Sequence, residues 1–128
     1  MANVKVTILG CGSSLGVPVI GCDCPVCLSP DSKNHRLRSS IFIEMDQTKL
    51  LVDVTPDFRQ QALRQGIKDL DAVFVTHCHA DHVHGIDDIR PFNFFHGKSL
   101  PFYCDENTAD KLRENFKYIF SCTPSTVF

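Results

Sequence analysis

The chain has 128 residues, which is enough for one domain with its own core and too few for two. Hydrophobic residues make up 43% and charged residues 22%, as in ordinary globular proteins, and the formal net charge of −2 gives no electrostatic footprint for nucleic acid or an anionic membrane. No apolar run approaches the ~20 residues that span a bilayer, and the start of the chain lacks a signal-peptide core.

The cysteine content indicates a reducing environment. There are seven cysteines, an odd number, and three of them are clustered, which favours thiol or metal chemistry over a disulfide framework. We therefore expect a cytoplasmic protein with no membrane partner and no stable nucleic-acid binding.

The N-terminal part of the chain predicts three strands and a long loop. Residues 4–9 alternate apolar and polar side chains, as a strand does. Residues 10–30 hold four glycines and three prolines without a helical period and predict a loop. Residues 40–45 and 49–54 predict a hairpin that turns near Asp46.

A helix is predicted after the hairpin. Thr55 suits its N-cap, Pro56 its first helical position and Gly66 its C-terminal end. The predicted inner face of this helix consists of Phe58, Ala62 and Leu63.

The rest of the chain predicts two more strands and two helices. Residues 71–76 combine β-branched and aromatic side chains and indicate a buried strand. A short helix is expected near Asp81, a short strand at 100–104 and a last helix over 107–120. The apolar stripe of that last helix consists of Ala109, Leu112, Phe116, Ile119 and Phe120.

This order of elements predicts an α+β fold, a mixed sheet with helices on one face. The open face of such a sheet needs a second layer, which this chain does not obviously provide. No internal repeat or low-complexity linker divides the chain, so residues 1–128 are treated as one unit.

The loop after the predicted strand 71–76 carries the strongest functional signal, four potential metal ligands within six residues. His77 and His79 lie two residues apart, so both side chains can face one ion in an extended loop. Asp81 and His82 follow where the chain bends toward a helix, and they can face a second ion. Histidine and carboxylate suit Zn, Mn or Fe in a two-metal hydrolytic site, in which Asp81 is the candidate catalytic residue. The alternative is a histidine-rich polar turn.

Three nearby residues have supporting or structural interpretations. A ligating imidazole needs its second ring nitrogen anchored by a carboxylate or a carbonyl, and Asp53 is the candidate anchor. The alternative for Asp53 is a turn residue or helix N-cap. Cys78 alternates away from the ligands and is expected in the core, and His84 is expected to be solvated or hydrogen-bonded rather than a ligand.

The second signal is the C-x-C-x-x-C cluster of Cys22, Cys24 and Cys27 within the 10–30 loop. Three thiolates suit three corners of a tetrahedral structural zinc site. His35, Cys11 or a residue outside the chain is the candidate fourth ligand. A redox pair is the alternative, but no helix pattern follows to lower a thiol pKa.

Residues 10–18, which read G-C-G-S-S-L-G-V-P, form a third pattern. They miss G-x-G-x-x-G by one residue and lack a P-loop lysine, which makes a nucleotide fingerprint improbable. Their backbone N–H groups either face the metal site or its substrate, or the segment is only a turn. Four polar side chains farther along could meet an anionic substrate or only solvent: Arg36, Arg38, Ser39 and Ser40.

Together the opening strand and glycine loop, Asp53 and the H-x-H-x-D-H loop resemble the metallo-β-lactamase superfamily. The cysteine cluster makes the chain similar to the phosphodiesterases of phosphonate breakdown, which act on cyclic phosphates and carry an extra structural zinc. The resemblance implies that His77 and His79 hold one ion and Asp81 and His82 the other. The ions would be manganese or zinc, and Asp53 would support the ligands.

The resemblance covers only the first half of that superfamily's αββα sandwich. The remaining ligands lie in the second half, and His96 does not match their motifs. We therefore expect a partial domain, a fragment or half-protein, with weak metal binding and little turnover on its own. The implied activity of the complete protein is hydrolysis of a small cyclic phosphodiester. The alternatives are a thioester hydrolase, a tRNA 3′-processing nuclease, or a non-catalytic zinc-binding half-domain that pairs with itself as a homodimer.

Overall fold

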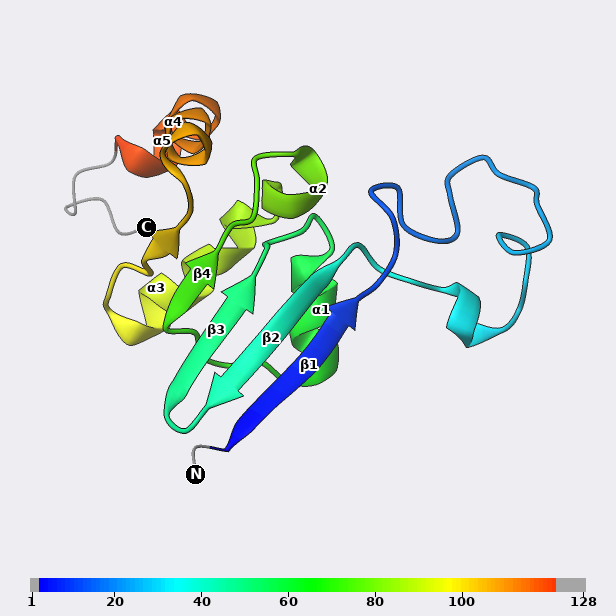
Figure 1. Ribbon diagram of the computed structural model, residues 1–128, viewed down its shortest axis with the longest axis horizontal. Helices are drawn as coiled ribbons and strands as arrows, with labels where there is room; N and C mark the ends of the chain where they lie inside the picture. The colour runs from blue at the N-terminus through cyan, green and yellow to red at the C-terminus, as the bar shows by residue number, and fades with distance from the viewer. Residues whose placement is uncertain (1–2, 122–128) are drawn as a thin grey trace.

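The computed structural model describes residues 3–121, which form a five-stranded sheet with helices (Figure 1). The strands are β1 (Val4–Gly10), β2 (Ser40–Met45), β3 (Thr48–Val52), β4 (Ala72–Phe74) and β5 (Phe102–Tyr103). They lie side by side in chain order, with β1, β2 and β3 antiparallel and β4 and β5 added in parallel. The mixed sheet confirms the predicted α+β class.

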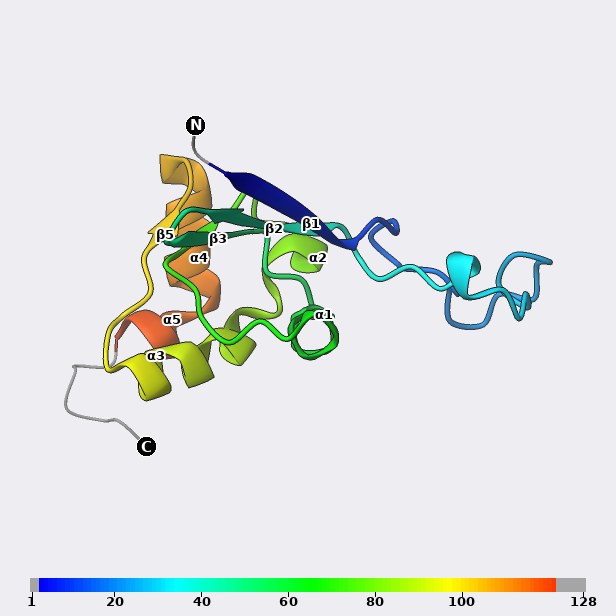
Figure 2. The ribbon, with the colours of Figure 1, turned by 90° about the horizontal axis from the view of Figure 1, so that it is seen from below.

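The helices cover one face of this sheet, as predicted, and Figure 2 shows them on one side of the strands. They are α1 (Phe58–Gln65), α2 (Ala80–Val83), α3 (Arg90–His96), α4 (Glu106–Asn115) and α5 (Lys117–Phe120), with the 3-10 turns η1 (Ser32–Asn34) and η2 (Ile86–Ile89). Within the described residues, no helix is long and apolar enough to cross a bilayer.

The core lies between the sheet and the helices. Leu9, Phe42, Leu51 and Val73 lie on four neighbouring strands and are at most 6% exposed, as expected for one face of a pleated sheet. Phe58 of α1 is 1% exposed and joins the same cluster. Burying a side chain of that size is worth about 1.5–3 kcal/mol.

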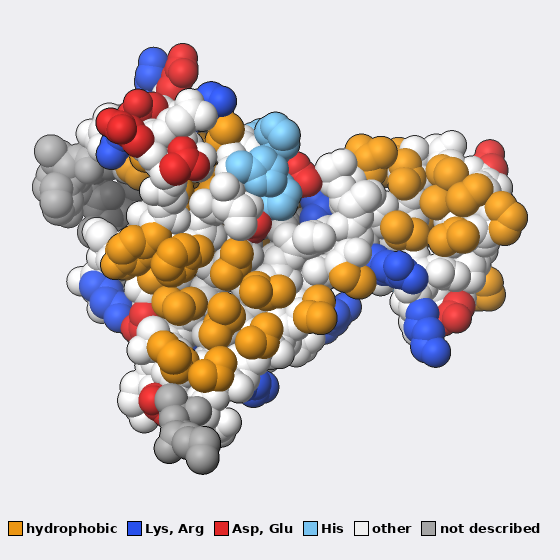
Figure 3. Space-filling view, viewed as in Figure 1, with side chains coloured by type: hydrophobic (Ala, Val, Ile, Leu, Met, Phe, Trp, Pro, Cys, Tyr) orange, Lys and Arg blue, Asp and Glu red, His pale blue; other side chains and the backbone are white. Residues whose placement is uncertain are grey.

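The opposite face of the sheet is also apolar, and it is open to solvent. Val4, Val6 and Ile8 of β1 are 52%, 56% and 64% exposed, and at the other edge Phe74 stacks on Tyr103 with ring centroids 5.3 Å apart. Figure 3 shows the hydrophobic side chains gathered over the strands on this face. The second layer that such a face requires is therefore not supplied by residues 3–121.

Helix α1 differs from its prediction at two points. It begins at Phe58 rather than at Pro56, because the buried Thr55 hydroxyl accepts a hydrogen bond from the Asp57 N–H and donates to Gln61 instead of capping the helix. Leu63, predicted on the inner face, is 65% exposed. The inner face includes the fully buried Gln61 instead.

Three strand predictions and one helix prediction were also too long. The strand predicted over 100–104 covers only Phe102–Tyr103. The strand predicted over 49–54 ends at Val52, because Asp53 adopts a left-handed φ of 63°. The strand predicted over 71–76 is limited to Ala72–Phe74. The helix predicted over 107–120 breaks at Phe116, whose φ of −118° and ψ of 41° separate α4 from α5.

Helix α3 was not predicted. Its first turn contains a proline, which suits a helix N-terminus, and its C-cap Gly97 takes a left-handed φ of 61°.

The predicted end of α1 at Gly66 is confirmed by the same kind of cap, with φ of 64°.

Candidate metal centre

A buried carboxylate organises the end of the sheet. Asp53 follows β3, is 5% exposed, and receives hydrogen bonds from two directions. The Thr76 backbone N–H and side-chain hydroxyl lie 2.8–3.0 Å from its oxygens, and the His82 Nδ1 lies 2.7 Å from Oδ2. These contacts keep a buried charge satisfied, and they fix the ring of His82 with its Nε2 atom directed away from Asp53.

Close backbone contact holds His82 beside Asp53. The Val54 N–H donates to the His82 carbonyl at 2.9 Å, and the Gly85 N–H donates to the Val54 carbonyl at 3.0 Å. A Cβ at Gly85 would stand 1.9 Å from the Thr55 carbonyl oxygen, so this approach requires glycine. These bonds hold the histidine loop, residues 77–82, against the end of β3.

Within the histidine loop, the predicted ligands lie in two pairs. His77 Nε2 is 3.1 Å from His79 Nδ1, and Asp81 Oδ2 is 3.3 Å from His82 Nε2. The rings of His77 and His82 are 4.0 Å apart, so the pairs are neighbours. Figure 3 shows histidine side chains clustered at the surface at one end of the sheet.

The donor atoms fit divalent ions in kind but not in number. Each pair offers two donors, whereas protein zinc sites use three or four. Across residues 3–121, only the cysteine cluster brings three or more ligand atoms within 4.8 Å of one another. The histidine loop therefore brings together two donor pairs, and neither pair alone is a complete zinc site.

Thr76 was not singled out in the sequence. Its hydroxyl contacts both Asp53 oxygens and also lies 3.0 Å from His77 Nδ1. A hydroxyl residue directly between a buried strand and a histidine motif is the available signal. Its partner Asp53 is 23 residues away, so sequence alone did not indicate the contact.

Cys78 and His84, the two residues that we expected not to bind metal, differ in their burial. Cys78 is half-buried rather than part of the buried core. His84 is exposed, with its ring edge packed against Phe116 at 5.7 Å, and takes no part in either ligand pair.

The cysteine cluster lies in the cysteine arm, residues 11–39, which projects from the body between β1 and β2 (Figures 1 and 2). The sulfur atoms of Cys22, Cys24 and Cys27 all lie within 4.8 Å of one another. Neither of the local candidates for a fourth ligand, His35 and Cys11, joins this group.

Hydrogen bonding changes the acidity of these thiols. The Cys27 backbone N–H, together with the Cys22 and Cys27 side chains, lowers the pKa of Cys24 to about 7. For Cys27, a hydrogen bond from the Val19 N–H lowers the pKa, but the neighbouring thiols and burial raise it more, and the net direction is upward. The hydrogen bonds to Cys24 therefore favour its thiolate, which is the form that binds zinc.

The polar residues proposed for an anionic substrate bond to other groups of the protein instead, and Arg38 among them joins the arm to the body. Arg38 pairs with Asp57 at 2.8 Å, and the Arg36 side chain donates to the Lys33 carbonyl. The hydroxyls of Ser39 and Ser40 donate to backbone carbonyls.

The N–H groups of Gly12, Gly16 and Val17 in the glycine loop are likewise used within the fold. The Gly12 N–H donates to the Leu37 carbonyl and the Gly16 N–H to the Ser13 carbonyl. Of the two interpretations of this segment, these bonds favour the structural turn.

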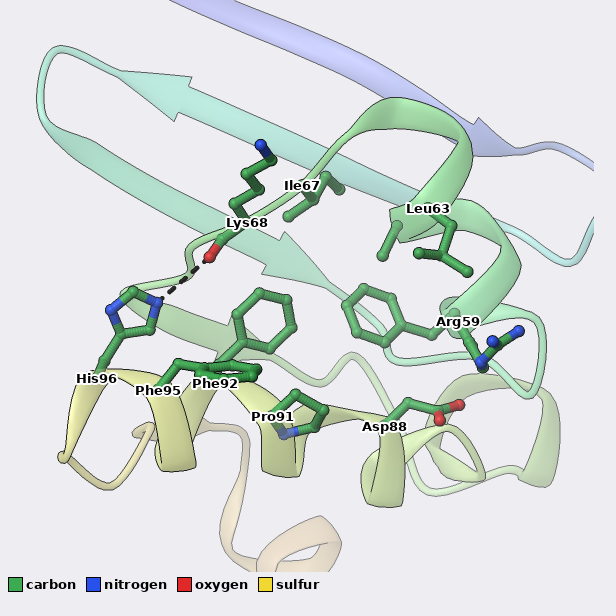
Figure 4. A pocket seen from close by; sticks show the side chains of 11 residues that line it. Arg59, Leu63, Ile67, Lys68, Asp88, Pro91, Phe92, Phe95 and His96 are labelled. Atoms are coloured by element: carbon green, nitrogen blue, oxygen red, sulfur yellow. Dashed lines mark hydrogen bonds between the residues drawn. The ribbon is translucent and has the colours of Figure 1, made fainter.

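A separate cavity of about 470 Å³ lies between α1 and α3, away from the histidine loop (Figure 4). Its wall is mainly apolar, with His96 at one end and Arg59 and Asp88 at the other. His96 Nε2 lies 3.2 Å from the Lys68 carbonyl oxygen. His96 thus lines this cavity and lies outside the histidine loop, as expected from the lack of a ligand motif around it.

The family of the chain follows from its fold and its motif. Residues 48–126 match the model of the beta-lactamase superfamily domain. The chain therefore belongs to the metallo-β-lactamase superfamily.

Three relatives show how much of such a protein is present. A solved diphosphatase from the PhnP family matches with a TM-score of 0.90 and 50% identity, over 94% of this chain and 49% of that one. Zinc-bound PqqB from Methylobacterium extorquens matches with a TM-score of 0.74 and 26% identity, over 90% and 40%. An octanoyltransferase from Porphyromonas gingivalis is 44% identical over 122 residues, 94% of this chain and 24% of that protein. The chain thus spans half or less of each relative.

Proposed function

We propose that this chain carries half of the two-metal active site of a longer hydrolase that cleaves small phosphodiesters, with cyclic phosphates as the expected substrates. The observation that carries the proposal is the pairing of His77 with His79 and of Asp81 with His82, beside the buried Asp53. The match to a solved diphosphatase supports phosphorus as the site of attack.

The residues of the histidine loop have distinct tasks under this proposal. His77 Nε2 and His79 Nδ1 would hold one ion, and Asp81 with His82 Nε2 the other. Asp53 keeps His82 oriented by accepting its Nδ1–H. Two divalent ions, manganese or zinc, would activate water at neutral pH and neutralise charge on the phosphoryl oxygens.

The remaining half of the site would come from sequence that the relatives have and this chain lacks. Two features support this division. Each ligand pair is short of a full coordination sphere. The exposed apolar face around Val6, Ile8 and Phe74 also requires a covering layer, which a second sheet would provide.

The cysteine arm would bind one structural zinc through Cys22, Cys24 and Cys27. The support is the close approach of their sulfur atoms and the lowered pKa of Cys24. The described cysteines are all free thiols, which fits the reducing cytosol proposed as the location. The fourth ligand would come from outside residues 3–121.

The test is hydrolysis of bis(p-nitrophenyl) phosphate and of a cyclic nucleotide by the complete protein, reconstituted with manganese or zinc. We expect His79→Ala to lose more than about 100-fold in activity. Removing a residue that only supports a metal ligand costs about 10- to 100-fold, and removing a ligand itself should cost more. His84→Ala is the matched control, because His84 is exposed and outside both pairs, and it should retain activity. Equal activity in the two variants would contradict the site assignment.

Substrate comparisons separate this proposal from the other hydrolases on the same scaffold. An acyl thioester and a tRNA precursor with a 3′ trailer are assayed with the same preparation. Faster turnover of either one than of the phosphodiesters would replace the proposed substrate class.

The exposed sheet face favours one further candidate, a non-catalytic zinc-binding half-domain that pairs with itself. Size-exclusion chromatography with light scattering on the 128-residue chain tests it. A monomer at high concentration would exclude this candidate. A stable dimer, in a complete protein that shows no hydrolysis, would favour it.

A further inference from the structure

The Thr76 hydroxyl lies at a branch point between the two ligand pairs. Its oxygen is 3.0 Å and 2.8 Å from the two oxygens of Asp53, and 3.0 Å from His77 Nδ1. On the other side of Asp53, His82 Nδ1 is 2.7 Å from Oδ2. One continuous chain of hydrogen bonds therefore joins an imidazole of the first pair to an imidazole of the second.

Counting protons fixes the direction of these bonds. A hydroxyl has one proton to donate, and an ionised carboxylate can only accept. If the Thr76 proton went to His77 Nδ1, two oxygen atoms would face each other at 2.8 Å with no proton between them. The Thr76 hydroxyl therefore donates to Asp53, and its oxygen accepts the proton of His77 Nδ1.

We propose that Thr76 is a positioning residue that holds neutral His77 in the Nδ1–H tautomer, and so leaves the Nε2 lone pair of His77 free for a metal ion. This inference rests on the proposed function. In the metal-free chain, the contact of 3.1 Å between His77 Nε2 and His79 Nδ1 is then a bond donated by His79, whose Nδ1 proton must leave before that atom can bind an ion. The opposite tautomer would place a proton on the very atom that must bind metal.

The same carboxylate orients both histidines, directly for His82 and through Thr76 for His77. Removing the hydroxyl should therefore affect the two rings unequally. In Thr76→Val the backbone N–H of residue 76 still reaches Asp53, since that bond of 2.8 Å does not use the side chain. His82 keeps its anchor, whereas His77 loses its only acceptor at Nδ1 among the described residues.

Long-range proton–nitrogen NMR of the metal-free chain, at about pH 8.5 where free imidazoles are neutral, tests the proposal. We expect the Nδ1–H tautomer for both His77 and His82 in the unaltered chain and in Thr76→Ser. In Thr76→Val, His77 should shift toward the Nε2–H tautomer while His82 does not change. Zinc affinity of the histidine loop, measured in Cys22→Ser/Cys24→Ser/Cys27→Ser, should fall about 10-fold or more in Thr76→Val and little in Thr76→Ser.

Two results would overturn the proposal: an Nε2–H tautomer of His77 in the unaltered chain, or the same His77 tautomer in Thr76→Val and Thr76→Ser. A poor spectrum of Thr76→Val leaves the first of these tests in place, because it needs only the unaltered chain. The measurement involves no turnover. The tautomer measurement would therefore give the same result even if the proposed hydrolase activity were absent. A failed tautomer prediction would, in turn, leave the proposed hydrolase activity unaffected.

Discussion

The histidine loop and the cysteine arm both gather metal-ligating side chains, but they are held in place by different means. The histidine loop is fixed by the fold, because Asp53 is 5% exposed and the segment up to Gly85 is bonded to Val54. The cysteine arm projects from the body, and Ile20 within it is 99% exposed. The core thus holds the histidine loop directly, whereas the cysteine cluster lies on a segment outside the core.

The largest difference between the two regions is expected in the free energy of unfolding. Phe58→Ala should lower it by about 3–5 kcal/mol, because Phe58 is 1% exposed in the core cluster. Ile20→Ala should change it by less than about 0.5 kcal/mol. Urea denaturation followed by circular dichroism measures both. A large effect at Ile20 would show that the arm packs against something.

A second difference concerns carboxylates. Asp53→Ala should lower the free energy of unfolding by about 3 kcal/mol, since it leaves the donors of Thr76 and His82 without a partner. Asp23, which is exposed on the arm, is the matched control, and its replacement by alanine should have little effect. If the two variants unfold at the same urea concentration, the Asp53 contacts do not organise the loop.

A third difference concerns zinc retention by the arm. Cys24→Ser should weaken binding of the tightly held zinc by about 100-fold or more, because the ~10–16 kcal/mol of a structural site is shared among about four ligands. Cys11→Ser removes an exposed thiol outside the cluster and should leave binding unchanged. Competition with a chromophoric chelator measures both affinities. Weaker binding in Cys11→Ser would make Cys11 the missing ligand.

The smallest expected effect is a difference in thiol reactivity in the metal-free chain. Hydrogen bonds from the Cys27 backbone and the Cys22 side chain lower the pKa of Cys24 to about 7, whereas burial raises the pKa of Cys104 in the body. Thiolates react with iodoacetamide, so the Cys24 rate should rise as pH increases through 7 and the Cys104 rate only at higher pH. Pulsed alkylation with mass spectrometry gives both profiles. Coincident profiles would mean that the arm does not hold its thiols together.

The sequence predicted what short spacing determines, namely the ligand pairs of the histidine loop, the cysteine cluster and most of the strands. It missed what depends on contacts between distant residues. Arg38 was a candidate for substrate, yet it pairs with Asp57, 19 residues away. The need for glycine at position 85 arises only where that residue meets Thr55.

The helix break has the same kind of cause. The apolar stripe of the predicted 107–120 helix continues past Phe116, so periodicity alone gave one helix. In the structure Phe116 packs its ring against His84 and ends α4, while Phe120 is 47% exposed. Tertiary packing therefore outweighed helical propensity at this position.

The most direct test of the half-site is the metal content of the 128-residue chain and of the complete protein after equilibrium dialysis against dilute zinc. We expect about one zinc per chain, lost when Cys22, Cys24 and Cys27 are replaced, and about three in the complete protein, as four-coordinate sites built from shared halves require. About three tightly held ions in the short chain alone, reduced by His79→Ala, would contradict the account. In that case the histidine loop would be a complete site in itself.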